Sequence, residues 1–537
     1  MIPKASYRQT ICFPLAFTDK SEGYGIMKNL PIGRQSFKDI RERNEVYVDK
    51  TRYLYALVKN GGVFFLSRPR RFGKSLLIST LNEIFLGNKE AFSGLWMENS
   101  DYDWKKYPII RIDFSKQKAK NTEQLERFIK EQLDYIAEDY GIRLTHQEYF
   151  SRFDQLIQLL SKESKIVILI DEYDKPIIDH LENPELAKEM REILKGFYTV
   201  IKAGDENLRF VLLTGVSKFS KAGVFSGLNN LNDISMDNKY ASILGLTENE
   251  ITDNFSGYLE IFAAEKNISV EDLIQKIRAW YNGYLFAGIG ERVYNPFSTL
   301  LLFDKNEFRN YWFETGTPSF LVNILKQTDF PLSSLESAEA EAEKFSVYDI
   351  ENLDPIPLLY QTGYLTIKEY SEEFGSYILG YPNFEVKNSF TKALASAFSK
   401  NHSDMPINSL IRSLRDRDWE TFFHGLREIF LKIDYDLQIN QEKYYQTIFY
   451  LIFTLIGLKT SAEVKTNIGR IDTVIDDRDI LIFEFKFSST GAGAQDALNQ
   501  IKSKKYYEKY QSSSKEIFLF GAEFRDRNIG EWIFEKV

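Results

Sequence analysis

Residues 63–77, VFFLSRPRRFGKSLL, decide how the N-terminal half of this chain is expected to fold. The apolar run Val63–Leu66 is typical of a buried parallel strand. A basic turn follows, and Gly73, Lys74 and Ser75 then begin a helix. A strand, a turn and a Gly-Lys-Ser helix start are the context of a phosphate-binding loop, because the helix N-terminus offers unpaired N–H groups and a positive dipole end to an anion. The sequence therefore predicts a nucleotide site that includes Gly73.

In such a loop, Lys74 reaches the β- and γ-phosphates of ATP and the hydroxyl of Ser75 holds Mg²⁺. Arg68 stands where the pattern usually has its first glycine. Together with Arg70 and Arg71 it crowds the turn with positive charge, where glycines normally supply only backbone. We therefore expect some of these arginines to face nucleotide phosphate or a neighbouring acidic element, and we take Arg68 and Arg71 as nucleotide-binding residues.

The composition is that of a large water-soluble protein. A chain of 537 residues suggests about three or four domains. The net charge of −9 argues against a protein that coats nucleic acid, although it leaves room for a local basic groove. The single cysteine, Cys12, excludes an internal disulfide framework, and no segment approaches the ~18 apolar residues of a membrane helix. We expect a cytoplasmic protein without membrane contact, and an N-terminal extension over residues 1–29.

Three more apolar runs continue the sheet that the first strand begins. Each is separated from the next by a segment with helical periodicity, which predicts parallel strands with helices on both faces of the sheet. The runs are Pro108–Phe114, Lys165–Asp174 and Leu208–Ser217.

Acidic residues end the apolar part of the strand predicted at Lys165–Asp174. Asp171 and Glu172 would lie at the carboxyl edge of the sheet, where ligands bind in open α/β folds. Asp171 would then bind the magnesium shell and Glu172 would polarise the attacking water. A strand that simply ends in a polar turn is the alternative, but the Gly-Lys-Ser loop upstream favours the functional interpretation. Thr214, at the end of the next strand, either senses the γ-phosphate or is a turn hydroxyl.

Six motifs follow one another between residues 30 and 330: RPRRFGKS, LIDEYDKP, LLTGVSKFS, GLTENEI, WYNGYLF and YNPFS. In this order they resemble the bacterial AAA-ATPase-like family. The resemblance implies an ATP-binding domain of the AAA/STAND sort. It also implies that an arginine in place of the first glycine is usual in this family.

The remaining chain is expected to divide into smaller parts. The acidic stretch 334–344, SLESAEAEAEK, is the best candidate for a linker. The order of helix, Gly363, strand and hairpin partner after it is the outline of a winged-helix module, and its acidic character indicates a structural or regulatory role. The expected parts are a P-loop domain at 30–250, a helical lid at 251–333, the winged-helix-like module at 345–400, a helical connector at 401–434 and a last α/β domain at 435–537.

The last part of the chain contains a second candidate site. The run ILIFEFKF, residues 480–487, follows a polar turn and predicts a hairpin with the β-rich run before it. Glu484 and Lys486 are two residues apart and project from the same face of the strand, and Asp472 on the neighbouring strand completes a cluster. Charged groups in an apolar strand are costly to bury unless they are paired or bound to a metal. A surface hairpin with a Glu484–Lys486 salt bridge is the simple alternative.

This cluster has the composition of a phosphodiester-hydrolysing site. The carboxylates of Asp472 and Glu484 suit Mg²⁺, with Mn²⁺ as an alternative metal. Lys486 would orient or deprotonate the attacking water, while the metal offsets charge on the phosphorane. In the helix predicted at Ala494–Tyr510, Gln500, Lys504 and Tyr507 lie along one stripe that could contact a nucleic-acid backbone.

The order G-R-I-D, E-F-K and a Gln/Tyr helix resembles the PD-(D/E)XK nuclease superfamily over residues 435–537. The resemblance implies that Asp472 and Glu484 are metal ligands, that Lys486 is the catalytic lysine and that Glu463 is an outer acid. The whole sequence thus predicts an α/β multidomain protein that couples ATP hydrolysis to cleavage of nucleic acid, with DNA favoured over RNA and a homo-oligomer left open. The alternative is a STAND-like switch whose nuclease fold only binds nucleic acid or a partner.

Overall fold

The computed structural model describes residues 27–537 with short gaps, so the expected N-terminal extension lies almost wholly outside the described residues. The gaps are 219–223, 226–227, 229, 316–318, 329, 342–353, 399–405, 432–440, 461–462, 468–470, 488–490 and 526–527. Only the backbone is described at 315, 319, 327, 333, 441–446, 458–460, 463–467, 471–472 and 487.

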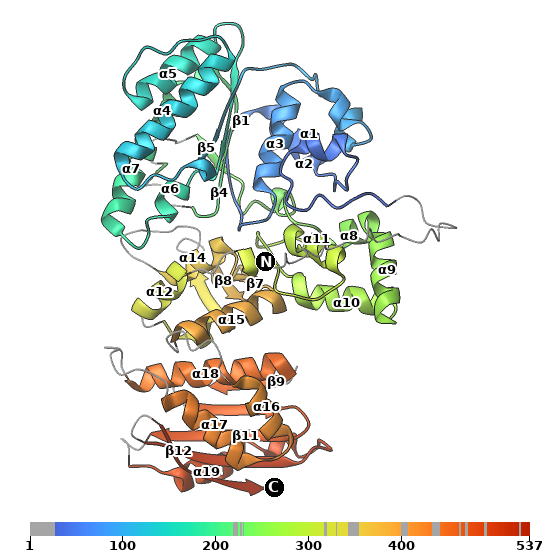
Figure 1. Cartoon of the computed structure of the whole chain (residues 1–537), viewed down its shortest axis with the longest axis vertical. Helices are drawn as coiled ribbons and strands as arrows, with labels where there is room; N and C mark the ends of the chain where they lie inside the picture. Colours follow the sequence, from blue (N-terminus) through green and yellow to red (C-terminus); the bar gives the residue numbers. More distant parts are fainter. Residues whose placement is uncertain are drawn as a thin grey trace, which may run out of the picture.

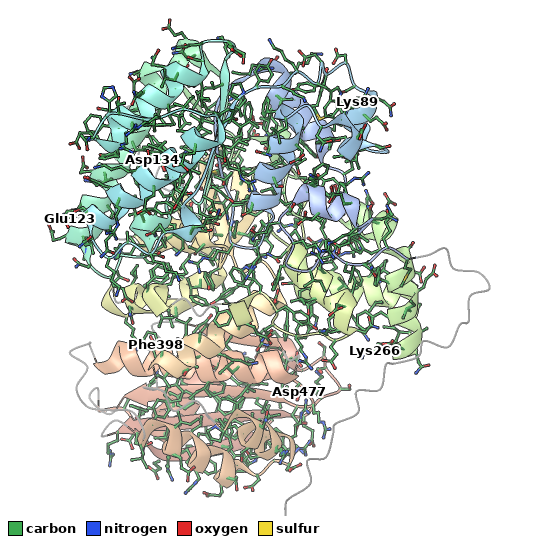
Figure 2. The ribbon with its side chains drawn as sticks, turned by 45° about the horizontal axis from the view of Figure 1, so that its top comes forward. Lys89, Glu123, Asp134, Lys266, Phe398 and Asp477 are labelled. Carbon is green, nitrogen blue, oxygen red and sulfur yellow. The ribbon has the colours of Figure 1, made fainter. Side chains whose placement is uncertain are left out.

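The chain forms three tiers along its longest axis (Figure 1). The N-terminal domain, residues 27–247, lies at one end. A middle tier of helices and a small sheet, residues 248–398, follows, and the C-terminal domain, residues 406–537, lies at the other end. Figure 2 shows side chains filling the space between the last two tiers, with Phe398 at the junction. Within the described residues, no helix is long and apolar enough to cross a membrane.

The N-terminal domain is built on a five-stranded parallel sheet in the order β2-β3-β4-β1-β5, which is a P-loop-like order. Strand β4 separates the strand before the phosphate loop from the strand that carries the acidic pair, so the three carboxyl ends lie side by side. The fifth strand has only three half-buried or exposed residues, too short to stand out as an apolar run. The strands are β1 Gly62–Ser67, β2 Ile109–Asp113, β3 Ile166–Asp171, β4 Leu208–Gly215 and β5 Leu231–Asp233.

Helices cover both faces of this sheet, as the apolar strands predict (Figure 1). All six residues of β3 are buried, because neither face of the strand reaches solvent. One face carries α1 Phe37–Glu42, α2 Thr51–Asn60 and α3 Lys74–Phe85, and the other carries α4 Thr122–Asp139, α5 Tyr149–Leu160, α6 Lys175–Ile178 and α7 Pro184–Ala203.

The middle tier contains helices in the segment predicted as a lid, which we call the lid helices, and, beside them, a module of two helices and a three-stranded sheet in the order β6-β8-β7. The predicted order of helix, Gly363, strand and hairpin partner is present. The lid helices are α8 Glu248–Asn254, α9 Ser256–Lys266, α10 Val270–Tyr281 and α11 Pro296–Lys305. The module consists of β6 Ala338–Glu341, α14 Pro355–Thr362, β7 Thr366–Ser371, β8 Ser376–Gly380 and α15 Phe384–Phe398. Helix α12 Ser319–Gln327, also in the predicted lid segment, packs instead against α14 and α15 of the module.

The prediction of a linker at 334–344 is wrong for residues 338–341, because they form β6, which pairs antiparallel with β8. Ala338 is buried against the core. Glu339 alternates with it and accepts a hydrogen bond from Ser376 Oγ at 2.9 Å. Low complexity concealed a strand pattern of period two, in which alanines face inward and glutamates outward.

Glu385 connects parts of the middle tier that are distant in sequence. Its side chain is 1% exposed. It accepts hydrogen bonds from the backbone N–H of Trp312 at 2.7 Å and from Ser298 Oγ of α11 at 2.9 Å. Burial is the largest cause that raises the pKa of this carboxyl to about 8, so the folded protein favours its neutral form at neutral pH.

Replacing Glu385 with glutamine is expected to remove a pH dependence of stability. Between the ordinary glutamate pKa and about 8, the unfolded chain ionises this group and the folded chain does not, so wild-type stability falls as pH rises through that window. The loss over the whole window is on the order of 5 kcal/mol, because one pKa unit corresponds to about 1.4 kcal/mol. Melting temperatures at pH 5, 6.5 and 8 should fall less for Glu385→Gln than for wild type or the exposed control Glu189→Gln. Parallel slopes for all three proteins would contradict the assignment.

The C-terminal domain is a five-stranded mixed sheet in the order β13-β12-β11-β10-β9. The predicted β10–β11 hairpin is confirmed, and β11 pairs parallel with β12. Helix α19 covers one face, and α16, α17 and α18 cover the other (Figure 1). The elements are α16 Ile407–Arg415, α17 Trp419–Leu431, α18 Gln441–Thr460, β9 Glu463–Asn467, β10 Ile471–Asp476, β11 Ile480–Phe487, α19 Ala494–Ser503, β12 Ile517–Arg525 and β13 Asn528–Lys536.

Three helices of this domain differ from the prediction. Helices α16 and α17, expected as a connector, pack on the sheet, with the Phe423 ring stacked 4.4 Å from that of Trp532. Helix α19 ends at Ser503, well before the predicted end at Tyr510. Lys505 has a left-handed backbone (φ 53°), which stops the helix. The residues beyond it therefore leave the stripe on which Gln500 lies.

Candidate functional site

The phosphate loop joins β1 to α3 through two left-handed residues. Arg71 has φ 67° and Gly73 has φ 94°, and the helix begins immediately afterwards at Lys74. The glycine is needed because side-chain-bearing residues rarely adopt such a backbone. Glu172, at the end of the neighbouring acidic strand, also has a positive φ of 53°. Strained backbone therefore occurs on both sides of the predicted nucleotide site.

Lys74 connects the loop to the acidic strand. Its ammonium donates to the backbone carbonyls of Arg68 and Pro69 at 3.1 and 3.3 Å, and it lies 3.4 Å from Glu172 Oε1. The lysine side chain is only 3% exposed. A buried ammonium needs such partners, and phosphate oxygens could replace them because they are also strong acceptors.

Asp171, Ser75 and Thr214 form the oxygen cluster expected for magnesium. Thr214 Oγ1 donates to Asp171 Oδ1 at 2.6 Å, and Ser75 is a second hydrogen-bond partner of this carboxyl. Burial raises the pKa of Asp171, and both hydrogen bonds lower it. Carboxylate and hydroxyl oxygens are ligands that Mg²⁺ accepts, so Asp171 and Ser75 fit the ion. Thr214 is fully buried and its hydroxyl binds Asp171, and a role as a γ-phosphate sensor stays a prediction.

An open cleft of about 380 Å³ lies in front of the loop. Lys74, Ser75 and Glu172 face it, as predicted. The guanidinium of Arg71 also lines it, 4.8 Å from the ring of Phe297 in lid helix α11. Arg70 of the basic turn lines the cleft as well, in agreement with the expectation that some of these arginines face phosphate. Two further cations of the cleft, Arg34 and Lys175, were not predicted from the sequence.

A second, apolar hollow of about 120 Å³ adjoins this cleft and shares Gly73 and Leu76 with it. Its walls come from the segment before β1, from α3, from the turn before α8 and from lid helix α11. Apolar side chains dominate them, which suits a flat aromatic base. Its lining includes Val46, Tyr47, Val48, Leu54, Leu77, Leu244, Phe255 and Pro296.

Arg68 does not lie in the cleft, which corrects the prediction that it binds nucleotide phosphate. Its side chain is 1% exposed and points behind the loop. The guanidinium donates to the carbonyls of Ser67, Ser235 and Tyr240 and lies 4.2 Å from the ring of Phe286. Burial lowers its pKa to about 10, so it stays charged at neutral pH.

The second site gathers three of the predicted residues around Glu484. This side chain is fully buried, and its Oε1 accepts from Lys486 Nζ at 2.7 Å and from Gln500 Nε2 of α19. Lys486 Nζ also donates to Gln500 Oε1 at 2.6 Å. Asp472 pairs directly with Glu484 across β10 and β11, although its side chain lies outside the described residues.

A metal fits this second site for a specific reason. Glu484 Oε2 is buried and has no hydrogen-bond partner among the described residues. An unpaired buried carboxylate oxygen is costly, and a divalent cation shared with the opposite acid would satisfy it. The described side chains contain no cluster of three metal-ligating residues, and neither Asp472 nor the proposed outer acid Glu463 is among them.

Tyr507 leaves the stripe on which Gln500 lies, and its ring packs against an apolar cluster that includes Ile501 and Leu519. Lys504 keeps its place one turn beyond Gln500, because its N–H donates to the Gln500 carbonyl, and its side chain is exposed. The contact of Lys504 with nucleic acid stays a prediction, whereas the predicted place of Tyr507 depended on a longer helix. The positive φ at Lys505 turns the chain away before Tyr507 is reached.

Sequence reasoning missed a charged pair on β12. Glu523 stands next to Lys486 in the parallel β11–β12 register. Its Oε1 accepts from Arg525 Nη2 at 2.7 Å and Nε at 3.0 Å, while the arginine is 62% exposed. The alternation of Gly521, Glu523 and Arg525 was the available signal, because these residues share one face of the strand.

Comparison with known proteins gives two family matches. The family described as "Predicted AAA-ATPase" matches residues 31–225, and the PD-(D/E)XK nuclease superfamily matches residues 440–532. A protein of Azotobacter chroococcum mcd 1, described as an uncharacterized protein in the vnfD 5' region, is 41% identical over 514 residues. The alignment covers 93% of this chain and 96% of that protein.

Proposed function

Because this chain belongs to the AAA-ATPase-like proteins that carry a C-terminal PD-(D/E)XK nuclease superfamily domain, we propose that it hydrolyses ATP and that this activity is coupled to metal-dependent cleavage of nucleic acid. One observation supports both halves of the proposal. In each domain, a lysine ammonium lies within ion-pair distance of a glutamate, which follows the end of β3 in the first domain and lies within β11 in the second. The distances are 3.4 Å for Lys74 and Glu172 and 2.7 Å for Lys486 and Glu484.

At the ATP site, the triphosphate would enter the basic cleft in front of the loop. Lys74 would exchange the carbonyls of Arg68 and Pro69 for β- and γ-phosphate oxygens, which also releases Glu172 from the ammonium. Glu172 would then orient and polarise the attacking water. Asp171 and Ser75 would hold Mg²⁺, which neutralises the charge that develops on the phosphates. The adjoining apolar hollow would take the adenine.

At the nuclease site, this chain's residues would position a water and a phosphodiester. Asp472 and Glu484 would hold Mg²⁺ or Mn²⁺, which supplies charge stabilisation to the transition state. Lys486 donates to both Glu484 and Gln500, and an ammonium fixed in this way would orient the nucleophilic water. Arg525, held by Glu523 on the next strand, offers an exposed guanidinium for a neighbouring phosphate. We favour DNA over RNA as the substrate.

The proposal is tested by assaying purified full-length protein on linear and circular DNA and on RNA, with Mg²⁺ or Mn²⁺, with and without ATP. We expect metal-dependent cleavage whose rate changes with ATP, together with release of inorganic phosphate. A chelator should abolish both activities, because both sites depend on a divalent cation. Nucleotide turnover without any cleavage would instead support the STAND-like switch, whose C-terminal domain only binds nucleic acid or a partner.

A further inference from the structure

The back of the phosphate loop is held by residues of the middle tier. The indole Nε1–H of Trp312 donates to the carbonyl of Arg70 at 3.1 Å. A Cβ at Gly363, the residue that ends α14, would lie 2.7 Å from Pro69 Cβ, so the helix end touches the loop backbone. The loop therefore has two sides, with the nucleotide cleft in front and this contact behind.

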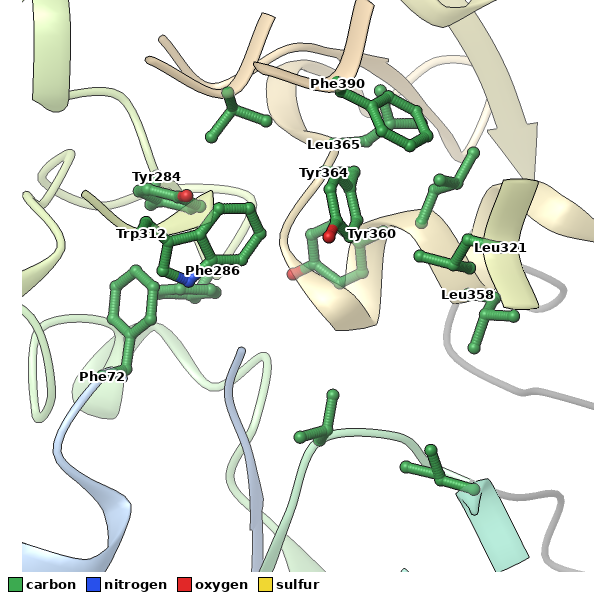
Figure 3. Close-up of a cluster of buried hydrophobic side chains, with 14 of the residues drawn as sticks. Phe72, Tyr284, Phe286, Trp312, Leu321, Leu358, Tyr360, Tyr364, Leu365 and Phe390 are labelled. Carbon is green, nitrogen blue, oxygen red and sulfur yellow. The ribbon is translucent and has the colours of Figure 1, made fainter. Parts of the chain in front are cut away.

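Trp312 is itself fixed on both sides. Its backbone N–H donates to the buried Glu385, which also binds Ser298 of lid helix α11. Its ring lies 5.1 Å from the ring of Tyr364, and Tyr364 lies 4.5 Å from Phe390 of α15. Figure 3 shows this row of aromatic side chains. If the loop backbone moves, these rings must move with it, because close-packed rings have few alternative arrangements.

The same packing continues to the second site. Helix α15 packs along α18, and Tyr450 of α18 donates to Glu336 Oε1 at 3.1 Å. On its other side, α18 presents Phe449, 4.4 Å from Phe485 of β11. Phe485 lies between Glu484 and Lys486 in the strand and faces the opposite side of the sheet. The middle tier thus contacts the loop at one end and the back of the catalytic strand, through α18, at the other.

We propose that Trp312 is a positioning residue for the phosphate loop, and that its hydrogen bond to the Arg70 carbonyl couples nucleotide binding to the nuclease domain. The proposal rests on the proposed function. When phosphate oxygens replace the Arg68 and Pro69 carbonyls around Lys74, these two peptides are released. The next carbonyl, that of Arg70, is the one that Trp312 binds, so the release alters the position of this hydrogen bond. Coupling of this kind acts in both directions. If ATP changes the affinity of the C-terminal domain for its ligand by a given factor, that ligand changes the affinity for ATP by the same factor.

The test removes the indole N–H and keeps an aromatic ring, with Trp312→Phe in the full chain. The matched control is Trp280→Phe, because Trp280 packs on Phe384 of α15 without contacting the loop. Hydrogen exchange is followed in peptides from α18 and β11 with saturating ATP and Mg²⁺ and without them. Wild type and the control should show an ATP-dependent change, which Trp312→Phe should lose. The variant should also bind ATP about tenfold more weakly, the effect of losing one hydrogen bond that positions the loop.

Several outcomes distinguish a failure of the coupling from a failure of the proposed function. An ATP-dependent exchange change in Trp312→Phe equal to wild type overturns the coupling, as does an ATP-bound wild type that shows no change. Absence of ATP binding by calorimetry overturns the ATP half of the proposed function, and absence of cleavage overturns its nuclease half. If Trp312→Phe does not fold, Tyr450→Phe provides the test from the other end. Its α18 and β11 peptides should show a smaller ATP-dependent exchange change than wild type, and an undiminished change overturns the proposal.

Discussion

Lys74→Ala is expected to lose nearly all ATP hydrolysis. The lysine is the buried cation that would contact the β- and γ-phosphates, and no other ammonium lies within ion-pair distance of Glu172 among the described residues. Removal of one charged contact that acts on the transition state typically lowers kcat by about 10²–10³-fold. Phosphate release should fall by at least this factor, and ATP affinity measured by calorimetry should fall with it.

Two other variants make this prediction specific. Glu172→Gln should bind ATP and turn it over slowly, because it keeps the shape of the side chain but cannot polarise water. Lys195→Ala, which breaks an ion pair with Glu192 on the outer face of α7, should behave as wild type. Unchanged turnover in Lys74→Ala would remove the loop from the mechanism. Unchanged turnover in Glu172→Gln would remove only the proposed role of that glutamate.

Asp472→Asn and Lys486→Ala are expected to abolish nucleic-acid cleavage while ATP hydrolysis persists. Asp472→Asn keeps the size of the side chain and removes the negative charge that a metal needs. Lys486→Ala removes the ammonium beside Glu484 and lowers cleavage by about 10²–10³-fold if it stabilises the transition state. Gel assays with end-labelled DNA measure the cleavage rate, and phosphate release in the same samples reports on the first site.

The lysine variant needs a stability control. Glu484 is fully buried, and loss of one partner from a buried ion pair typically destabilises by about 3–5 kcal/mol. The role of the metal site is therefore judged from Asp472→Asn, and melting curves identify any unfolding of Lys486→Ala. Lys515→Ala, which breaks an ion pair with Asp476 at the hairpin end, should cut at the wild-type rate. A folded Asp472→Asn that still cuts would exclude the assigned metal site.

Much of the architecture was predictable because local periodicity carries it. The fully apolar runs before Arg68 and Asp171 predict strands buried on both faces, and alternation around Glu484 predicts a half-apolar strand in a hairpin. Lys74, Ser75, Asp171 and Glu172 were expected at one sheet edge, and they lie together there. Their roles in catalysis remain predictions that the variants above test.

The differences arise where a residue's partner is distant in the chain. Arg68 was expected at phosphate, yet it donates to carbonyls near Ser235 and Tyr240, which the strand order brings behind the loop. Tyr507 was expected on the stripe with Gln500, but a left-handed residue at 505 ends the helix first. Low complexity at 334–344 suggested a linker, and pairing with β8 makes part of it a strand.

The sequence by itself determined the elements and the residue types of both sites, because hydrophobic period, glycine placement and charge spacing are local properties. Only the tertiary structure decided which polar group meets which partner. The Trp312 indole reaches the Arg70 carbonyl, and Gln500 reaches Glu484 and Lys486. Such contacts depend on strand order and on helix packing between segments far apart in the chain. A buried donor pairs with whichever acceptor that packing brings within hydrogen-bond distance.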